Sequence, residues 1–349
     1  MTGFNNPGGW LAVLGIAFLG GALASWTGIP AAWFTGAMIA TSIAAVSGLK
    51  ARLPQRLFDA AMVLMGMMLG GGVTPEMVAG VGKWPLSLVC LAVAMVAVQS
   101  GVQLFLQRVG GWDRTTSFYS ALPGAMIYAT IAATESGADV RKVVISQLAR
   151  IFLLIAVLPT VVTLIEPGRE IPARVVAPIE GLALTVALGI AGSLLFHRLR
   201  MPVGLMTGSL LASAFLHGSG IVVGTFPTWV MVIGFLVIGG SVGTRFIGTT
   251  LAYMAENAVP ALGAFVISAG LSGLFAFALT MAVDLPIDQV IIAFAPGGVD
   301  AMMAVALAMQ MDSAYVAAHQ LLRLMGVPFL APLAARFVLR RERAAQAAE

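Results

Sequence analysis

Charged residues are scarce in this chain of 349 residues: Asp, Glu, Lys and Arg together make up 10%, whereas hydrophobic residues make up 59%. A soluble domain carries roughly 25% charged residues, so this composition excludes an ordinary water-soluble fold. The apolar runs are long enough to cross a bilayer, which takes about 20 residues of helix. They do not alternate in polarity as the strands of a membrane barrel would, so we expect helical spans.

Cysteine is nearly absent, because Cys90 is the single one in the chain. An intramolecular disulfide and a Cys-based metal site are therefore excluded. The sequence also lacks a cluster of His, Cys and Asp with metal-ligand spacing, a phosphate-binding loop and a nucleophile elbow. We accordingly expect no metal, no cofactor and no enzymatic activity. Lys and Arg (19) exceed Asp and Glu (15) only slightly, which in a membrane protein reflects topology rather than nucleic-acid binding.

What the chain does contain is an internal repeat. "LPGAM" begins at Leu122 and is followed by a "QLAR" that ends at Arg150, whereas "APGGV" begins at Ala295 and is followed by a "QLLR" that ends at Arg323. A shift of 173 residues superposes these segments, and a shift of 172 aligns the earlier part of each half. Duplicated halves in a membrane protein are typical of transporters whose site lies between the halves. The coinciding pairs include Pro123 with Pro296, Gly124 with Gly297, Asp139 with Asp312, Gln147 with Gln320 and Arg150 with Arg323.

Each half contains five strong hydrophobic spans and a sixth, weaker segment interrupted by Pro-Gly. The strong spans are predicted at 10–27, 30–49, 57–73, 85–107 and 142–165, and at 179–196, 202–217, 227–244, 257–282 and 314–337. The weaker segments cover about 118–136 and 291–309. The resulting organisation is a membrane repeat at 10–165, an outer-side linker at 166–178, a second membrane repeat at 179–337 and a cytoplasmic tail at 338–349.

The distribution of Lys and Arg indicates whether the weaker segments cross the membrane. If they do not cross and the N-terminus is cytoplasmic, 14 Lys and Arg residues lie inside and 3 outside, with Arg150 and Arg323 left in the membrane; if both cross, the numbers become 11 and 6. The positive-inside rule favours the first arrangement, with both termini cytoplasmic. Five crossings per half is an odd number, so the second half is inserted upside down. The predicted fold class is an all-α integral membrane protein of two inverted-topology repeats, each with five transmembrane helices and one re-entrant or broken Pro-Gly segment.

The Pro-Gly segments are the first candidate for a binding site. Proline fits the first position of a helix but not its interior, so Pro123-Gly124 and Pro296-Gly297-Gly298 are predicted to begin half-helices. Backbone that is not helical at membrane depth must be buried in protein or line a cavity. The free N–H groups and positive dipole end of a half-helix attract anions, so two such ends facing each other predict an anion site near the midplane. The alternative is an ordinary kink in a membrane helix.

The last helix of each half carries the second candidate feature. Gln147 and Arg150 share one helix face, and Gln320 and Arg323 repeat this spacing. Arg150 follows Lys142 by eight residues, or about 12 Å of helix, which puts it near the middle of a core about 30 Å thick. A charge there usually faces a bundle interior or a watery cavity, so we expect the two Arg to contact the substrate and the two Gln to orient it. The alternative is that each Arg caps carbonyls of a broken helix or pairs with an acid, the candidates being Asp139, Asp300 and Asp312.

Asp300 and His319 complete the set of candidate binding residues. Asp300 follows the second Pro-Gly segment, where an Asp either caps the helix or takes part in coupling to protons or Na⁺. His319 titrates near neutral pH and either orients the ligand or is a hydrogen-bonded part of the scaffold. The Gly-rich stretches 66–72 and 239–243 either let helices pack closely or form an unwound backbone that binds a cation.

At these residues the chain resembles the AbrB-type bacterial membrane protein family, which has a duplicated membrane domain and is often labelled as an ammonia monooxygenase or its regulator. The resemblance is carried by "LPGAM…SGADVRKVVISQLAR" and "APGGVDAMMAVALAMQMDSAYVAAHQLLR", and it covers essentially residues 10–337. The first repeat departs from the family pattern, with "PGAMIYA" where a second Gly and a more polar start are expected, and Asp312 lacks the preceding Gly-Ala. The resemblance implies kinship with inverted-repeat transporters, as an analogy of fold.

The sequence therefore predicts a secondary transporter of the bacterial inner membrane, which carries a small organic anion such as a carboxylate through a midplane site by alternating access. The rival prediction, implied by the family label, is a membrane-embedded ligand sensor that regulates gene expression through a partner protein. The expected partners are the lipid bilayer, the small-molecule anion and a second copy of the chain in a homodimer, with no nucleic acid. The expected substrate-binding residues are Pro123, Gly124, Gln147, Arg150, Pro296, Gly297, Gly298, Asp300, His319, Gln320 and Arg323.

Overall fold

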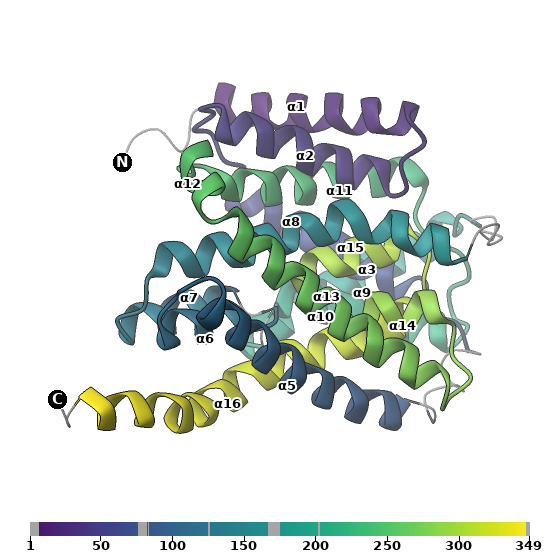
Figure 1. Ribbon diagram of the computed structural model, residues 1–349. Helices are drawn as coiled ribbons and strands as arrows, with labels where there is room; N and C mark the ends of the chain where they lie inside the picture. The colour runs from purple at the N-terminus through teal and green to yellow at the C-terminus, as the bar shows by residue number, and fades with distance from the viewer. Residues whose placement is uncertain are drawn as a thin grey trace. The chain divides into compact units, whose positions relative to one another are not determined.

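The long apolar runs fold into helices that end at Gly, Pro or short polar turns, as the computed structural model shows for residues 7–75, 82, 84–124, 126–166, 175–201 and 203–346 (Figure 1). Part of the predicted linker, residues 167–174, lies outside this range. The first half contains α1 (Pro7–Trp26), α2 (Ala32–Val46), α3 (Gln55–Gly70), α5 (Trp84–Arg108), α6 (Arg114–Ala121), α7 (Met126–Glu135) and α8 (Val140–Ile165). The second half contains α9 (Ile179–Arg198), α10 (Gly204–Gly218), α11 (Thr228–Gly243), η2 (Thr244–Phe246), α12 (Leu251–Glu256), α13 (Ala258–Thr280), α14 (Ile287–Phe294), α15 (Val299–Ala308) and α16 (Ser313–Gln346).

The helices repeat as the sequence does. α2 and α10 have 15 residues each, α3 and α11 have 16, α6 and α14 have 8, and α7 and α15 have 10. The residues before α2 and α10, Ala31 and Val203, both adopt the left-handed conformation, with φ of 54° and 51°. That conformation is costly for a β-branched residue such as Val203. Its recurrence at matched positions shows that the two halves keep one local geometry.

Within the described residues, six helices are long and apolar enough to cross a membrane, namely those at Gly8–Trp26, Trp84–Arg108, Val140–Ile165, Ile179–Arg198, Thr228–Phe246 and Ala258–Thr280. α2 and α15 are shorter apolar helices. The prediction of an all-α membrane protein is therefore confirmed. Each of the ten predicted spans coincides with a helix. α2, α3 and α10 rise only about 22–24 Å, less than the roughly 30 Å of a hydrocarbon core, so the number of full crossings stays a prediction.

The chain forms two compact units, and each unit draws on both halves of the sequence. The first unit comprises Met1–Trp84, Ile155–Thr249 and Asp300–Ala318. The second comprises Pro85–Leu154, Thr250–Val299 and His319–Glu349. The units therefore do not follow the boundary between the repeats.

Within the first unit, the third helix of each half packs on the second helix of the other half. α3 packs on α10. α11 packs on α2, which in turn lies beside α1 (Figure 1). Glycines make the approach close: a methyl group on Gly70 would lie 2.6 Å from the backbone nitrogen of Ala214, and one on Gly243 would lie 2.7 Å from that of Ser42. Both Gly-rich stretches are helical up to these glycines, so the structure supports close packing rather than an unwound cation site.

The second unit contains α5, α13 and the Pro-Gly segments of both halves. Val98, Val102 and Leu106 of α5 pack in one buried cluster with Ala264 of α13. α13 also packs on α14. Ala121 of α6 lies in the same cluster, so α5 and α13 pack against the interrupted helices of both repeats.

The glycine contact in the first unit can be tested by adding one methyl group. Gly70→Ala is expected to lower the stability of the purified protein by about 1–3 kcal/mol, because the methyl would press on the backbone of α10. Gly15→Ala, in α1, is the control, since nothing lies within 4 Å of the added methyl, and it is expected to be neutral or slightly stabilising. Thermal unfolding in detergent measures both, and equal midpoints for the two variants contradict the tight packing.

Candidate functional site

Each Pro-Gly segment interrupts a helix rather than merely starting one. α6 ends at Ala121 and is followed by Leu122 (φ −56°, ψ 122°), whereas α14 ends at Phe294 and is followed by Ala295 (φ −56°, ψ 126°). A residue before proline is pushed into this extended conformation, which ends the helix there. The sequence predicted the half-helices α7 and α15 that follow the interruptions. It did not resolve α6 and α14, which precede them.

The interrupted helix of the first repeat folds back as a hairpin. The hydroxyls of Tyr119 in α6 and Ser136 beyond the end of α7 lie 2.8 Å apart. The backbone N–H of Asp139 donates to Oγ1 of Thr116 near the start of α6, at 2.9 Å. Eight helical residues span about 12 Å, so two collinear helices would hold these pairs far apart. α7 therefore returns along α6, and Pro123-Gly124 forms the tip of this hairpin.

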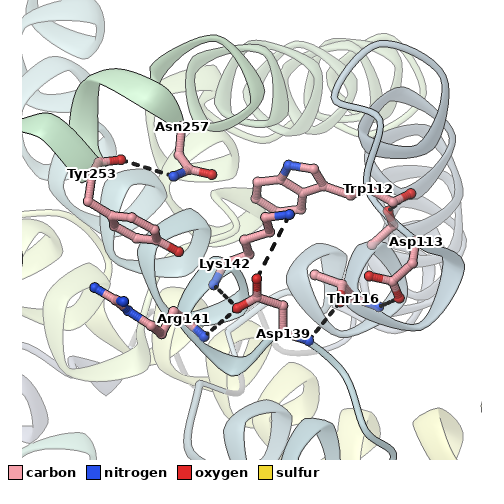
Figure 2. A network of polar contacts seen from close by, with 9 residues as sticks. Trp112, Asp113, Thr116, Asp139, Arg141, Lys142, Tyr253 and Asn257 are labelled. Atoms are coloured by element: carbon pink, nitrogen blue, oxygen red, sulfur yellow. Dashed lines mark hydrogen bonds and ion pairs between the residues drawn. The ribbon is translucent and has the colours of Figure 1, made fainter.

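Polar residues tie the base of the hairpin together (Figure 2). Asp113 caps α6 by accepting from the N–H of Thr116 at 2.8 Å. Asp139 caps α8 by accepting from the N–H groups of Arg141 and Lys142, and it lies 3.8 Å from the Lys142 ammonium. These caps satisfy free N–H groups at helix starts, so they fix where both helices begin.

Aromatic rings cover the two cations at the same base. The Arg141 guanidinium lies over the ring of Tyr253, 4.6 Å from its centroid, and the Lys142 ammonium is 5.7 Å from the ring of Trp112. Burial first, and then the negative charge of Asp139, raise the pKa of the Tyr253 hydroxyl. The ring therefore stays neutral at physiological pH and keeps its cation–π contact with Arg141.

α8 and α16 hold the interrupted helices by the same pair of side chains. Gln147 donates to the carbonyl of Tyr119 at 3.2 Å, and Arg150 donates to that of Leu122 at 2.8 Å. In the second repeat, Gln320 donates to the carbonyls of Ile292 and Ala293, at 3.1 and 3.3 Å. Arg323 donates to Ala295, to Gly297 at 2.8 Å and to the side chain of Gln320. Both arginines therefore cap carbonyls of the interrupted helices, which is one of the two alternatives that the sequence left open.

The two Pro-Gly interruptions meet each other inside the second unit. A methyl group on Gly124, whose φ is +75°, would lie 2.8 Å from Nε of Arg323 and 3.0 Å from the carbonyl oxygen of Gly297. Glycine is thus required at the first tip for its conformation and for the close approach of the second repeat. The tip of the first repeat and Arg323 of the second repeat therefore lie against each other.

The arginines at this crossing are buried without an acid. Arg150 and Arg323 are 2% and 1% exposed, and neither forms an ion pair with a carboxylate among the residues that the structure describes. In that part of the chain, Nε of each arginine lacks a hydrogen-bond partner, as do Oε1 of Gln147 and Oγ of Ser120. Burying two cations and several polar atoms without partners at one crossing costs free energy unless another group compensates their charge and hydrogen bonds.

A small pocket opens at the crossing. It is lined by one face of α5, by Ser272 of α13, by Phe294, by the prolines of both tips and by Arg323. The space holds about one water molecule. Ten of the eleven predicted site residues lie in the second unit, and Asp300 lies in the first. Apart from His319, those ten belong to the two Pro-Gly tips or to the Gln and Arg side chains on α8 and α16: Pro123, Gly124, Gln147, Arg150, Pro296, Gly297, Gly298, Gln320 and Arg323.

His319 and Asp300 have other partners. His319 is fully buried, and its Nε2 lies 2.8 Å from the hydroxyl of Ser87 in α5, which is the scaffold alternative. Asp300 belongs to the first unit, where it forms an ion pair of 2.6 Å with Arg245. The contacts of these two residues therefore do not support a substrate-binding role for either.

The sequence reasoning overlooked several polar residues of the second unit. Gln99 of α5 donates to the carbonyl of Phe118 at 2.9 Å, Ser272 lines the pocket, and Ser120 is fully buried. A Gln inside an otherwise apolar span was a usable signal, because polar side chains there commonly hold neighbouring helices. Among the described residues, no group of three His, Cys, Asp or Glu side chains is arranged to hold a metal ion.

Comparison with known proteins gives one family. The family model described as "Transition state regulatory protein AbrB" matches residues 2–70 and 33–339, two overlapping stretches that agree with an internal duplication. The chain is similar to a protein of Escherichia coli (strain K12) whose name, AbrB, proposes that it is a regulator, with 28% identity over 95% of this chain and 96% of the relative. It is also similar to the protein YhjN of Bacillus subtilis (strain 168), with 24% identity over 91% of this chain and 90% of the relative.

The base of the hairpin offers a test of the local geometry. Asp139→Ala is expected to lower stability by about 1 kcal/mol, because it removes the oxygen that accepts from the first N–H groups of α8. Asp139→Asn keeps an acceptor and is the matched control, expected to retain most of the stability. Thermal unfolding of the two variants measures the difference, and an Asn variant as unstable as the Ala variant would assign the effect to the Lys142 ion pair instead.

Proposed function

The chain belongs to the AbrB family of membrane proteins, and we propose that it is a secondary transporter of a small organic anion, of the carboxylate class. The observation that carries this proposal is the pair of buried arginines at the crossing of the two Pro-Gly interruptions. Neither has an acid partner among the described residues, and each keeps an unpaired Nε. An anion at the crossing would supply the missing negative charge.

The half-helices add to the attraction. α7 and α15 begin directly after the interruptions, so their first N–H groups and positive dipole ends lie beside the tips. A helix N-terminus stabilises an anion by about 0.3–1 kcal/mol in exposed settings and by more when it is partly buried. Carboxylate fits this environment because it accepts from both guanidinium and backbone N–H groups.

We further propose an inverted arrangement of the two repeats in a bacterial plasma membrane, with both termini in the cytoplasm. The charge distribution favours five crossings per repeat. The α6–α7 hairpin supports this view, because a segment whose two ends meet at Thr116 and Asp139 does not add a crossing. Transporters with inverted repeats alternate access by moving one group of helices against the rest around a site near the midplane.

A ligand sensor is the second candidate, because the relative from Escherichia coli carries a name that proposes regulation. A sensor would bind the same anion at the same crossing and pass the signal to a partner protein. The two functions separate in one experiment. A transporter moves the anion across a vesicle that contains the purified chain alone, whereas a sensor binds it without net movement.

Vesicle uptake therefore tests the proposal. Purified protein in liposomes is expected to accumulate a radiolabelled short carboxylate above protein-free liposomes. Arg323→Met is expected to weaken binding of the carboxylate about 30-fold or more, since it removes a buried charge-assisted contact. Uptake by this variant should fall accordingly. Arg56→Met, an exposed arginine at the start of α3, is the control and should transport like the unaltered protein.

Two results decide between the readings. Uptake that is unaffected by Arg323→Met, in a variant with normal thermal unfolding, removes the arginine crossing as the site. Binding of a carboxylate without uptake favours the sensor.

A further inference from the structure

We propose that the crossing selects monocarboxylates whose remaining part is a short apolar chain, and rejects dicarboxylates and inorganic phosphate. This inference rests on the proposed function and narrows its substrate class. It comes from the distribution of donors and apolar atoms around the pocket at the two tips.

Arg323 offers the pocket one free donor direction. Its two terminal nitrogens donate to Ala295, to Gly297 and to Gln320, all within the same unit. Nε has no partner among the described residues, and Arg323 lines the pocket. The guanidinium is thus fixed in place by its outer end while its Nε edge can bind one carboxylate. Because its orientation is set before the ligand arrives, little side-chain freedom is lost on binding.

The remaining wall is apolar. Leu91, Ala94, Met95 and Val98 of α5 line the pocket, and their spacing of three and four residues puts them on one face of the helix. Phe294 and the prolines of both tips complete the lining, and the hydroxyl of Ser272 is its one other polar side-chain group. Val93 lies on another face of the same helix and is 53% exposed. The pocket is therefore lined by the one face of α5 that carries these four residues.

We expect this lining to select ligands by the number of charges that they carry. A monocarboxylate would place its oxygens at Nε of Arg323 and its carbon chain against Leu91 and Val98. A dicarboxylate of similar length would press its second charge against Leu91 and Val98, neither of which carries a donor. An ionised group without a partner in an apolar setting is strongly disfavoured, so the second charge should cancel the benefit of the first.

The lining also limits chain length. The space holds about one water molecule as it stands, so a ligand must displace part of the wall. Met95 is the adaptable member, because its unbranched thioether side chain can take several rotamers. The neighbouring prolines cannot yield in this way. Each added methylene should therefore tighten binding until the chain reaches the rigid part of the wall.

The test is a binding series on the full-length protein in detergent. The sodium salts of acetate, propionate, butyrate, malonate, succinate and phosphate are compared at constant ionic strength by thermal shift, with calorimetry for the salts that bind. We expect about a fourfold lower Kd per methylene from acetate towards butyrate, the value for burying one CH₂ group. Malonate, succinate and phosphate are expected to produce no shift.

A pair of matched variants locates the chain-binding wall. Val98→Thr keeps the volume and adds a hydroxyl to the wall, so it should reduce the gain per methylene while leaving acetate binding nearly unchanged. Val93→Thr makes the same change on the exposed face of α5 and should bind like the unaltered protein.

The outcomes are distinct. Binding that strengthens with chain length, and loses this dependence in Val98→Thr alone, supports the inference. Dicarboxylates or phosphate that bind as tightly as the monocarboxylates, or an absence of chain-length dependence, overturn the inference and leave the anion site intact. If no anion of the series stabilises the folded protein, the proposed function fails as well.

Discussion

The second unit depends on one requirement: a helix interrupted within a low-dielectric environment must have its freed carbonyls satisfied by other parts of the protein. Proline lacks the N–H that would serve the carbonyl four residues earlier, which is that of Tyr119 or Ile292. The helices also end before the prolines, so the carbonyls of Leu122 and Ala295 have no helical partners. The long side chains of Arg150 and Arg323 reach them from the following helix. Arginine suits this task because its planar fork can serve carbonyls at one end and still present a donor at the other.

The same requirement explains why a structural contact and a binding role are compatible. A guanidinium that only capped a carbonyl could be replaced by a neutral amide, which would avoid the cost of burying a charge. Gln147 and Gln320 perform that neutral task three residues earlier on the same helices. Retaining a full charge at Arg150 and Arg323 is then an additional cost, which the proposed anion would offset. The carbonyl contacts hold each guanidinium in position, and the proposed anion would complete its neutralisation.

Much of this arrangement could be predicted from the sequence, and its limits have physical causes. The repeated Pro-Gly and Gln-Arg spacing placed the interruptions and the buried arginines, because helix geometry fixes both. The acceptors were not predictable, since Leu122 precedes Arg150 by 28 residues and its position depends on the hairpin fold. α6 and α14 were missed because eight residues are too few for a clear hydrophobic period. The Arg245–Asp300 ion pair joins residues 55 apart, and no local pattern marks it.

That ion pair also distinguishes the two repeats, which bears on the alternating access proposed above. Arg245 and Asp300 correspond to Gly72 and Ile127 in the first half, so the first repeat has no equivalent charges. If the repeats exchange conformations during transport, two identical repeats would give two access states of equal energy. An ion pair of 2.6 Å that has no counterpart in the other repeat would make such an exchange unequal, because the two states would differ in that one interaction. On the proposed transport function, the duplicated Pro-Gly and Gln-Arg elements would be the parts that exchange, and the unmatched pair would favour one of the two access states.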